Sequence, residues 1–237
     1  MKTVLLIIFL LLSLVLPLSL ALFNKRRGMV ASMAIGTAIY VVATVITNFL
    51  SLVTKLEGLE SFEDRQAYTV FVTLALLFAV WLFSRFKGFY DDKNKSDLIY
   101  SGFSLVNLFI NNMNSYSFLL FIAMNNDVET LSSIYQAETA KELVTYFESI
   151  DTGDIALMIV EMILVFLIMR YFFNAICQKD RKMVDYFTFL IGLFVLYFAQ
   201  YCINNLVVSF VIYILLLIFG YRSKISNLFK KRKADAK

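Results

Sequence analysis

The sequence contains no histidine, one proline, eight glycines and two cysteines among its 237 residues. Histidine is the usual general base near neutral pH and a common metal ligand. Its absence disfavours histidine-dependent hydrolysis, and a zinc site would need cysteines or carboxylates alone. Cys177 and Cys202 are too far apart in the sequence to form a dithiol motif, so we expect two buried, small apolar side chains.

Charged residues are scarce as well, at 17% of the chain, whereas soluble domains carry about 25%. Hydrophobic residues make up 60% and aromatic residues 16%, and the mean hydropathy is +0.74. This composition excludes a cytosolic enzyme, a secreted disulfide scaffold and a disordered tail protein. We therefore expect an integral membrane protein.

A membrane-spanning helix needs about 20 mostly apolar residues, and seven stretches of the sequence qualify. They are 3–23, 29–53, 67–84, 98–124, 155–177, 183–203 and 206–221. The stretch 98–124 is long and more polar, so it can also be read as two shorter pieces, which would give eight passes or a re-entrant segment. The sequence thus predicts an all-α polytopic helix bundle, with residues 1–221 as one transmembrane domain and 222–237 as a basic cytoplasmic tail.

The distribution of positive charge predicts that the N-terminus lies outside and the C-terminus inside. Lysine and arginine concentrate in cytoplasmic loops, and with this orientation 17 of the 22 fall inside and four outside. Three positive residues follow the first span and only Lys2 precedes it. This asymmetry favours a retained first helix over a cleaved signal peptide.

The one sizeable loop, 125–154, carries apolar residues at helical spacing and is predicted to lie outside. Two short amphipathic helices lying on the outer surface would satisfy this spacing, and Thr152-Gly153 is predicted to end the second one. The loop is acidic, so it either docks a cationic partner or only caps the bundle. The periodic residues are Val128, Leu131, Ile134, Tyr135, Leu143, Tyr146, Phe147 and Ile150.

A stripe of polar residues runs along the fourth span. Steps of three, four and three residues place its members on one face of a helix. Polar groups inside a membrane are costly, so the stripe either lines a ligand or ion path, or faces a partner protein, or holds the bundle together by interhelical hydrogen bonds. The stripe consists of Ser104, Asn107, Asn111 and Asn114.

The fifth span contains two ionisable residues, Glu161 and Arg170, which lie nine positions apart. Nine residues of helix rise about 13 Å, so the two cannot pair directly. Arg170 is predicted to reach the inner lipid headgroups. The carboxyl of Glu161 cannot reach water in this way, so we expect it to be protonated or hydrogen-bonded to the Asn stripe or to Gln200 of the sixth span.

Two further patterns have ordinary interpretations. The spacings Ser32-x-x-x-Gly36 and Ala34-x-x-x-Ala38 predict a face for close helix packing in the second span. The basic cluster of the tail predicts contact with anionic lipid headgroups, and no folded basic domain accompanies it to suggest nucleic-acid binding. The cluster is Lys230, Lys231, Arg232 and Lys233.

The order of these features resembles the YhfC-type branch of the CAAX-protease and bacteriocin-processing membrane peptidases, over about residues 10–220. Catalysis in that family needs a Glu-Glu-x-x-x-Arg motif, a histidine on the next polar helix and a second histidine later in the chain. Here Arg85 could match the arginine of the motif, but Trp81 and Leu82 replace the glutamates, and there is no histidine. Asn107 stands about where the polar helix of the family carries its acidic or histidine group. Glu161 resembles the glutamate that the family carries further along the chain. The resemblance implies a catalytically inactive relative in a bacterial cell membrane.

We therefore expect a non-enzymatic membrane protein without a cofactor or a metal. The leading hypothesis is a partner-binding assembly subunit of a membrane complex, or an immunity-type protective factor, whose contact surfaces are the Asn stripe, Glu161 and the outer loop. The alternative is a small-molecule-binding or transporter subunit, like the substrate-binding components of energy-coupling transporters. The third hypothesis is an active intramembrane peptidase.

Overall fold

The computed structural model describes residues 1–24, 28–56, 59, 61–85, 93–125, 128–132, 136–177 and 183–235, without the side chains of 93, 94, 114, 184 and 223–235. All regular elements in these ranges are helices, in agreement with the predicted all-α class. They are α1 (Lys2–Phe23), α2 (Met29–Val53), α3 (Phe62–Phe83), α4 (Lys93–Ser104), the π-helical η1 (Leu105–Ile110), α5 (Asn111–Met124), α6 (Val128–Ser132), α7 (Ala137–Ser149), α8 (Thr152–Ile176), α9 (Met183–Tyr201) and α10 (Leu206–Asp235).

Four of these helices, α1, α2, α3 and α8, are long and apolar enough to cross a membrane. A fifth candidate is the segment Lys95–Met113 together with Ser115–Met124, whose two parts meet at an angle of 43°. The sequence left open whether 98–124 is one helix or two, and the structure gives a bent pair with η1 in its course. The apolar helices Asp185–Tyr201 and Leu206–Arg222 are shorter.

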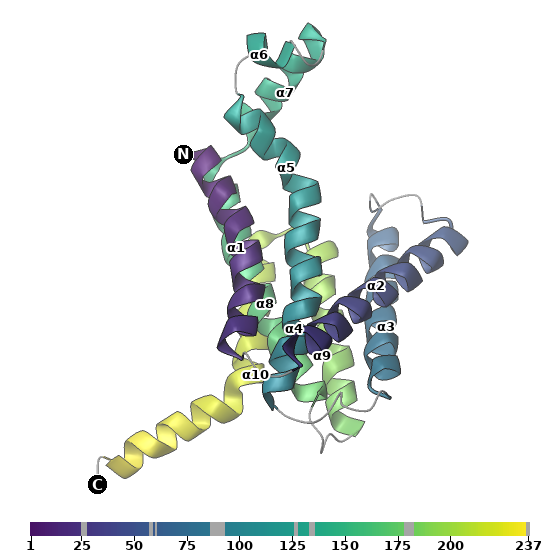
Figure 1. The fold of residues 1–237 in the computed structure, drawn as a ribbon, viewed down its shortest axis with the longest axis vertical. Coiled ribbons are helices and arrows are strands. Elements are labelled where there is room, and N and C mark those ends of the chain that lie inside the picture. Colours follow the sequence, from purple (N-terminus) through teal and green to yellow (C-terminus); the bar gives the residue numbers. More distant parts are fainter. Residues whose placement is uncertain are drawn as a thin grey trace.

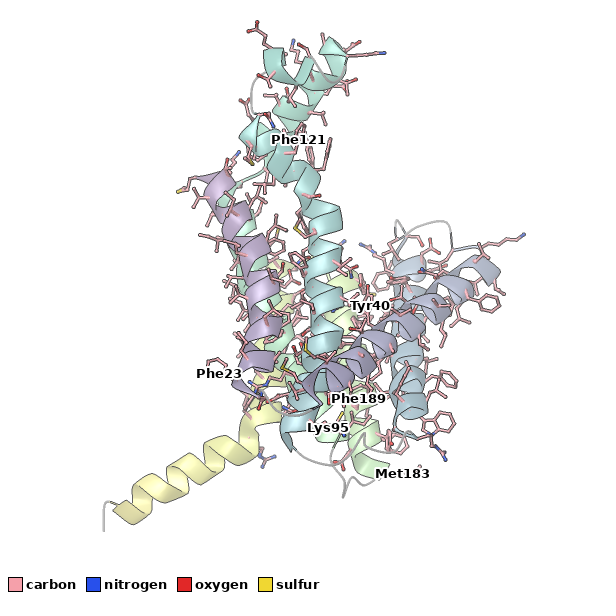
Figure 2. All side chains as sticks on the ribbon, in the orientation of Figure 1. Phe23, Tyr40, Lys95, Phe121, Met183 and Phe189 are labelled. Carbon is pink, nitrogen blue, oxygen red and sulfur yellow. The ribbon has the colours of Figure 1, made fainter. Side chains whose placement is uncertain are left out.

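The bundle has two distinct ends (Figure 1). The N-terminus, α6 and α7 lie at one end, which we call the α7 end. The C-terminal extension of α10 leaves the bundle at the other, which we call the tail end. Figure 2 places Phe23 and Lys95 toward the tail end and Phe121 close to α7. Helix α10 continues to Asp235 without a break at residue 222.

The core surrounds α8, which packs against α1, α4, α9 and α10. Its aromatic residues meet those of α4 and α9, and the hydroxyl of Tyr100 donates a hydrogen bond of 2.8 Å to the carbonyl of Phe166. The ring of Phe173 lies 4.8 Å from that of Phe103 and 6.0 Å from that of Phe189, measured between centroids. Through Phe173 these ring contacts link α8 to both α4 and α9.

Helices α2 and α4 approach one another so closely that glycine is required on both sides. A Cβ atom built on Gly36 would lie 1.8 Å from the carbonyl oxygen of Ile99, and one built on Gly102 would lie 1.9 Å from that of Met33. The predicted Ser32-x-x-x-Gly36 packing face is confirmed, since both residues are buried. The parallel pattern at Ala34 lies on the other side of the helix, where Ala34 is exposed.

Two helices, α6 and α7, form in the predicted outer loop and pack on the bundle, whereas Ile134 and Tyr135 of the predicted pattern lie outside the described residues. Leu131 of α6 and Phe147 of α7 are buried against residues of α1, α5 and α8. The ammonium group of Lys2 donates to the backbone carbonyls of Phe147 and Glu148, at 3.2 and 2.7 Å. The prediction that Thr152-Gly153 ends the second helix was wrong. Helix α7 ends at Ser149, and Gly153 lies in the first turn of α8.

The third helix begins earlier than the predicted third span. The prediction began at residue 67, where charge ends, but α3 begins at Phe62. The side chain of Ser61 accepts a hydrogen bond from the backbone N–H of Asp64 at 3.0 Å, and this cap extends the helix through the charged residues.

Candidate functional site

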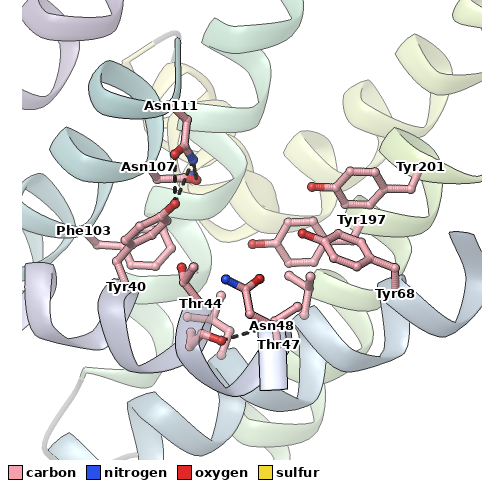
Figure 3. Close-up of a pocket in the computed structure, with 13 residues that line it drawn as sticks. Tyr40, Thr44, Thr47, Asn48, Tyr68, Phe103, Asn107, Asn111, Tyr197 and Tyr201 are labelled. Carbon is pink, nitrogen blue, oxygen red and sulfur yellow. Dashed lines mark hydrogen bonds between the residues drawn. The ribbon is translucent and has the colours of Figure 1, made fainter. Parts of the chain in front are cut away.

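Polar side chains of the bundle converge on a cavity of about 120 Å³, which we call the tyrosine cavity (Figure 3). It lies between α2 on one side, α3 and α9 on another, and the α4–η1–α5 segment on a third. The pocket is lined by Tyr40, Ala43, Thr44, Thr47, Asn48, Tyr68, Val72, Leu76, Phe103, Asn107, Asn111, Tyr197 and Tyr201.

One wall of the tyrosine cavity is a hydrogen-bonded group of three side chains. The amide nitrogen of Asn111 donates to the hydroxyl of Tyr40 at 2.8 Å, and this hydroxyl lies 3.1 Å from the amide oxygen of Asn111. The same amide nitrogen lies 3.4 Å from the side-chain oxygen of Asn107. Asn111 is exposed, so this wall stands at the opening of the cavity and joins α2 to α5.

The opposite wall carries polar groups that have no hydrogen-bond partner in the described part of the chain. The hydroxyls of Tyr68, Tyr197 and Tyr201 point from α3 and α9 into the cavity, toward Thr44 and Asn48 of α2 (Figure 3). Tyr197 is only 9% exposed. These hydroxyls face the open space of the cavity, where water or a bound solute can supply the partners that the described side chains do not.

A second cavity, of about 280 Å³, lies on the other side of Tyr201, and we call it the glutamate cavity. It is lined by Phe9, Leu108, Asn112, Tyr116, Met158, Glu161, Met162, Val165, Gln200 and Tyr201. The hydroxyl of Tyr213 donates to Oε1 of Glu161 at 2.8 Å. The amide nitrogen of Asn112 donates to the sulfur of Met162 at 3.5 Å.

The expectation that Glu161 bonds to the Asn stripe or to Gln200 is therefore corrected. Its described hydrogen-bond partner is Tyr213, which comes from α10. Gln200 lines the same cavity as Glu161, as the polar pattern suggested, but without a hydrogen bond between the two side chains.

The predicted stripe is divided between different environments. Ser104 is buried, and its hydroxyl donates a hydrogen bond of 2.8 Å to the backbone carbonyl of Tyr100. Asn107 and Asn111 line the tyrosine cavity, whereas the neighbouring Asn112 lines the glutamate cavity. The side chain of Asn114 lies outside the described residues. Within the described stripe, Asn107 and Asn111 therefore share one surface, and the buried Ser104 does not contribute to it.

Arg170 was predicted to reach lipid headgroups, but it instead forms an ion pair with Asp97. Its Nε and Nη2 donate to the two carboxylate oxygens of Asp97, each at 2.8 Å. Asn174 and Asn24 donate to the same carboxylate at 3.2 and 3.5 Å, and the hydroxyl of Ser96 bonds to Asn174. This cluster ties α1, α4 and α8 together at the tail end.

The partner of Arg170 was missed because the span was taken to begin one residue after Asp97. An ionisable residue inside an apolar helix predicts an opposite charge nearby, but the sequence does not show that Asp97, which is 73 positions from Arg170, comes to lie beside it. The tyrosines were missed for another reason. Tyrosines are common in the interfacial belts of membrane proteins, so their presence alone does not indicate a cavity, although Tyr197, Gln200 and Tyr201 lie close together in α9.

Comparison with protein-family models, with curated proteins and with solved structures gives no match. The peptidase resemblance therefore stays a prediction. Its three residues do not meet in one site, since Asn107 lines the tyrosine cavity, Glu161 the glutamate cavity, and Arg85 a groove beside Trp81 and Met183. The described residues hold no group of three acidic or cysteine side chains placed to bind a metal.

These features define the class of molecule without naming a member of it. The described chain is all-helical, and four or five of its helices are long and apolar enough to cross a membrane. Two cavities with polar walls lie within the helix bundle. The side chains of the basic cluster Lys230, Lys231, Arg232 and Lys233 lie outside the described residues, so their predicted lipid contact stays a prediction.

Proposed function

We propose that this chain is a non-enzymatic, multi-pass membrane protein that binds a small uncharged solute in the tyrosine cavity. The observation that supports this most directly is the set of polar groups without described partners. Three tyrosine hydroxyls, one threonine hydroxyl and the amide of Asn48 converge on one space of about 120 Å³. Unpaired polar groups at membrane depth are costly, and a bound solute with donors and acceptors removes that cost.

The lining also indicates the chemistry of the solute. It offers hydroxyls, amides and aromatic ring faces, and it contains no lysine, arginine, aspartate or glutamate. A charged ligand would be left without a counter-charge, whereas a neutral ring compound can stack on tyrosine and hydrogen-bond with the amides. The lining likewise offers no carboxylate, imidazole or amine to act as general base, which favours binding over catalysis.

The assembly-subunit and immunity-factor hypotheses have less support from the geometry. They require the Asn stripe to present a polar face to a partner helix. Asn107 and Asn111 instead line the tyrosine cavity, and Asn111, at its opening, bonds to Tyr40 of α2 within the same chain. An active peptidase has the least support, because Glu161 and Asn107 line different cavities.

We further propose seven crossings of a bacterial cell membrane, with the α7 end outside and the tail end inside. The positive-charge bias of the sequence supports this orientation. The arrangement of the helices fits a position of α7 and the tail on opposite sides of the membrane, because the N-terminus and α7 lie at one end and the extension of α10 at the other (Figure 1). The tyrosine cavity is then near the outer face, since Asn48 precedes the end of α2 by five residues, or about 7.5 Å.

Cysteine labelling tests the proposed orientation. In intact cells, a membrane-impermeant maleimide is expected to label Glu142→Cys of α7, and to label Lys230→Cys of the tail only after permeabilisation. The native Cys177 and Cys202 are both buried and give little background. Labelling of Lys230→Cys in intact cells, with Glu142→Cys protected, would reverse the proposed topology.

Solute binding is tested by thermal stability of the purified protein in detergent. A panel of uncharged, vitamin-sized ring compounds, including nicotinamide and uracil, is added at increasing concentration. Because a ligand that binds only the folded state stabilises it, a member of the fitting class is expected to raise Tm by about 5 °C near saturation. Tyr197→Phe removes one hydroxyl from the cavity and is expected to weaken this ligand about tenfold.

The matched control is Tyr146→Phe. Tyr146 lies on α7, is 61% exposed and does not line the cavity. Its substitution is expected to leave the ligand-dependent shift unchanged. The proposal fails if no compound of the panel changes Tm, or if Tyr197→Phe and Tyr146→Phe bind equally well.

A further inference from the structure

The glutamate cavity contains a carboxylate without a positive partner in the described part of the chain. Glu161 is partly buried and accepts one described hydrogen bond, from Tyr213 to Oε1. It forms no ion pair with a described lysine or arginine. Placing a carboxylate in a largely apolar bundle is costly unless a counter-charge or several donors accompany it.

The nearest cations along the helices that form this cavity are already engaged elsewhere. Arg170 lies on the same helix about 13 Å away and forms its bidentate ion pair with Asp97. Lys2 lies on α1, as Phe9 of the cavity does, and its ammonium group is bound to the carbonyls at the end of α7. The carboxylate of Glu161 is therefore available for a positive charge that comes from outside the chain.

The rest of the lining fits an organic cation better than a metal ion. Gln200 makes no hydrogen bond to a described residue, and its amide belongs to the lining of the same cavity as the Glu161 carboxylate. The rings of Phe9 and Tyr116 meet edge to face, with centroids 5.1 Å apart, and Tyr201 supplies a further ring. Aromatic faces attract ammonium groups, whereas hard metal ions require six or more oxygens at short distance. The volume of about 280 Å³ exceeds that of any bare ion.

We infer that the glutamate cavity binds a small organic ammonium ion, with the Glu161 carboxylate as counter-ion, the amide oxygen of Gln200 as a further acceptor, and aromatic rings around its carbon atoms. This binding site is distinct from the tyrosine cavity. The inference therefore does not depend on which solute, if any, occupies that cavity.

Two probes of nearly equal shape test the inference, 2-phenylethylammonium and the uncharged 2-phenylethanol. With wild-type protein in detergent at neutral pH, the ammonium compound is expected to raise Tm by about 5 °C near saturation. The alcohol at the same concentration is expected to give less than about a fifth of that shift, because it lacks the charge that the carboxylate attracts. This comparison needs no variant and so does not depend on the folding of one.

Two variants locate the effect. Glu161→Gln keeps the shape of the side chain but removes its charge, and is expected to weaken the ammonium compound by about tenfold or more. Glu142→Gln removes the same charge from the exposed surface of α7 and is expected to leave the shift unchanged. If Glu161→Gln does not fold, Gln200→Met is used, with a smaller expected loss. Equal shifts with the amine and the alcohol, no shift with the amine, or an undiminished shift in folded Glu161→Gln would each overturn the inference.

Discussion

Gly36→Leu is expected to destabilise the folded bundle by about 3 kcal/mol or more and to lower Tm by on the order of 10 °C. The added Cβ would lie 1.8 Å from the carbonyl oxygen of Ile99. Because the obstacle is backbone and not the end of a flexible side chain, α2 and α4 have to separate. The measurement is thermal unfolding of the purified protein in detergent, followed by circular dichroism.

Separation of these two helices has a second expected effect. The hydroxyl of Thr37 donates to the carbonyl of Gly102 at 3.2 Å, and Tyr40, one turn further on, meets Asn111 at the opening of the tyrosine cavity. Gly36→Leu is therefore expected to abolish solute binding in the tyrosine cavity, even in detergents that keep the protein in solution.

The control for this substitution is Ala34→Leu, on the same turn of the same helix. Ala34 is exposed, so a larger apolar side chain there faces lipid or detergent. Its effect on stability is expected to stay within about 0.5 kcal/mol. If the two substitutions shift Tm equally, the close approach of α2 and α4 does not support the fold as described.

Arg170→Met is expected to cost roughly 3 kcal/mol of stability, at the lower end of the range for breaking a buried ion pair. The variant leaves the Asp97 carboxylate, whose side chain is only 11% exposed, with the amides of Asn24 and Asn174 as its remaining partners. The Arg170 side chain is 31% exposed, which reduces the expected cost below that of a fully buried pair.

Substitution of the other partner of the ion pair is expected to cost less stability. Asp97→Asn leaves an arginine that is long enough to reach the lipid headgroups once it is released, so we expect a loss of about 1–2 kcal/mol. The control is Arg85→Met, which removes an exposed guanidinium 4.7 Å from the ring of Trp81, and we expect a loss below about 1 kcal/mol. Equal losses for Arg170→Met and Arg85→Met would contradict a structural role for the ion pair.

Most helices could be predicted from the sequence because they follow from apolar length. The expected spans 3–23 and 29–53 agree with α1 and α2 to within a residue at each end. The two helices of the outer loop were also predicted, from apolar residues at helical spacing. The boundary near Gly153 was wrong because a glycine in the first turn of a helix looks the same in the sequence as one after its end.

The candidate site was harder to predict because it depends on which helices become neighbours. Asn107 and Asn111 were recognised from their spacing, but the tyrosines that complete their cavity come from α2, α3 and α9. Helical periodicity shows which side chains share one face of a helix. It does not show which other helix that face packs against. A second difficulty is that the consecutive residues Asn111 and Asn112, about 100° apart around the helix, line different cavities.

Tyr201 lines both the tyrosine cavity and the glutamate cavity. A ligand that turns this ring in one cavity is expected to change the shape of the other, so we expect the ligand affinities of the two cavities to be coupled. Such coupling is reciprocal, since each ligand must change the affinity of the other by the same factor. Through this one side chain at the end of α9, a ligand in either cavity would change the affinity of the other cavity for its own ligand.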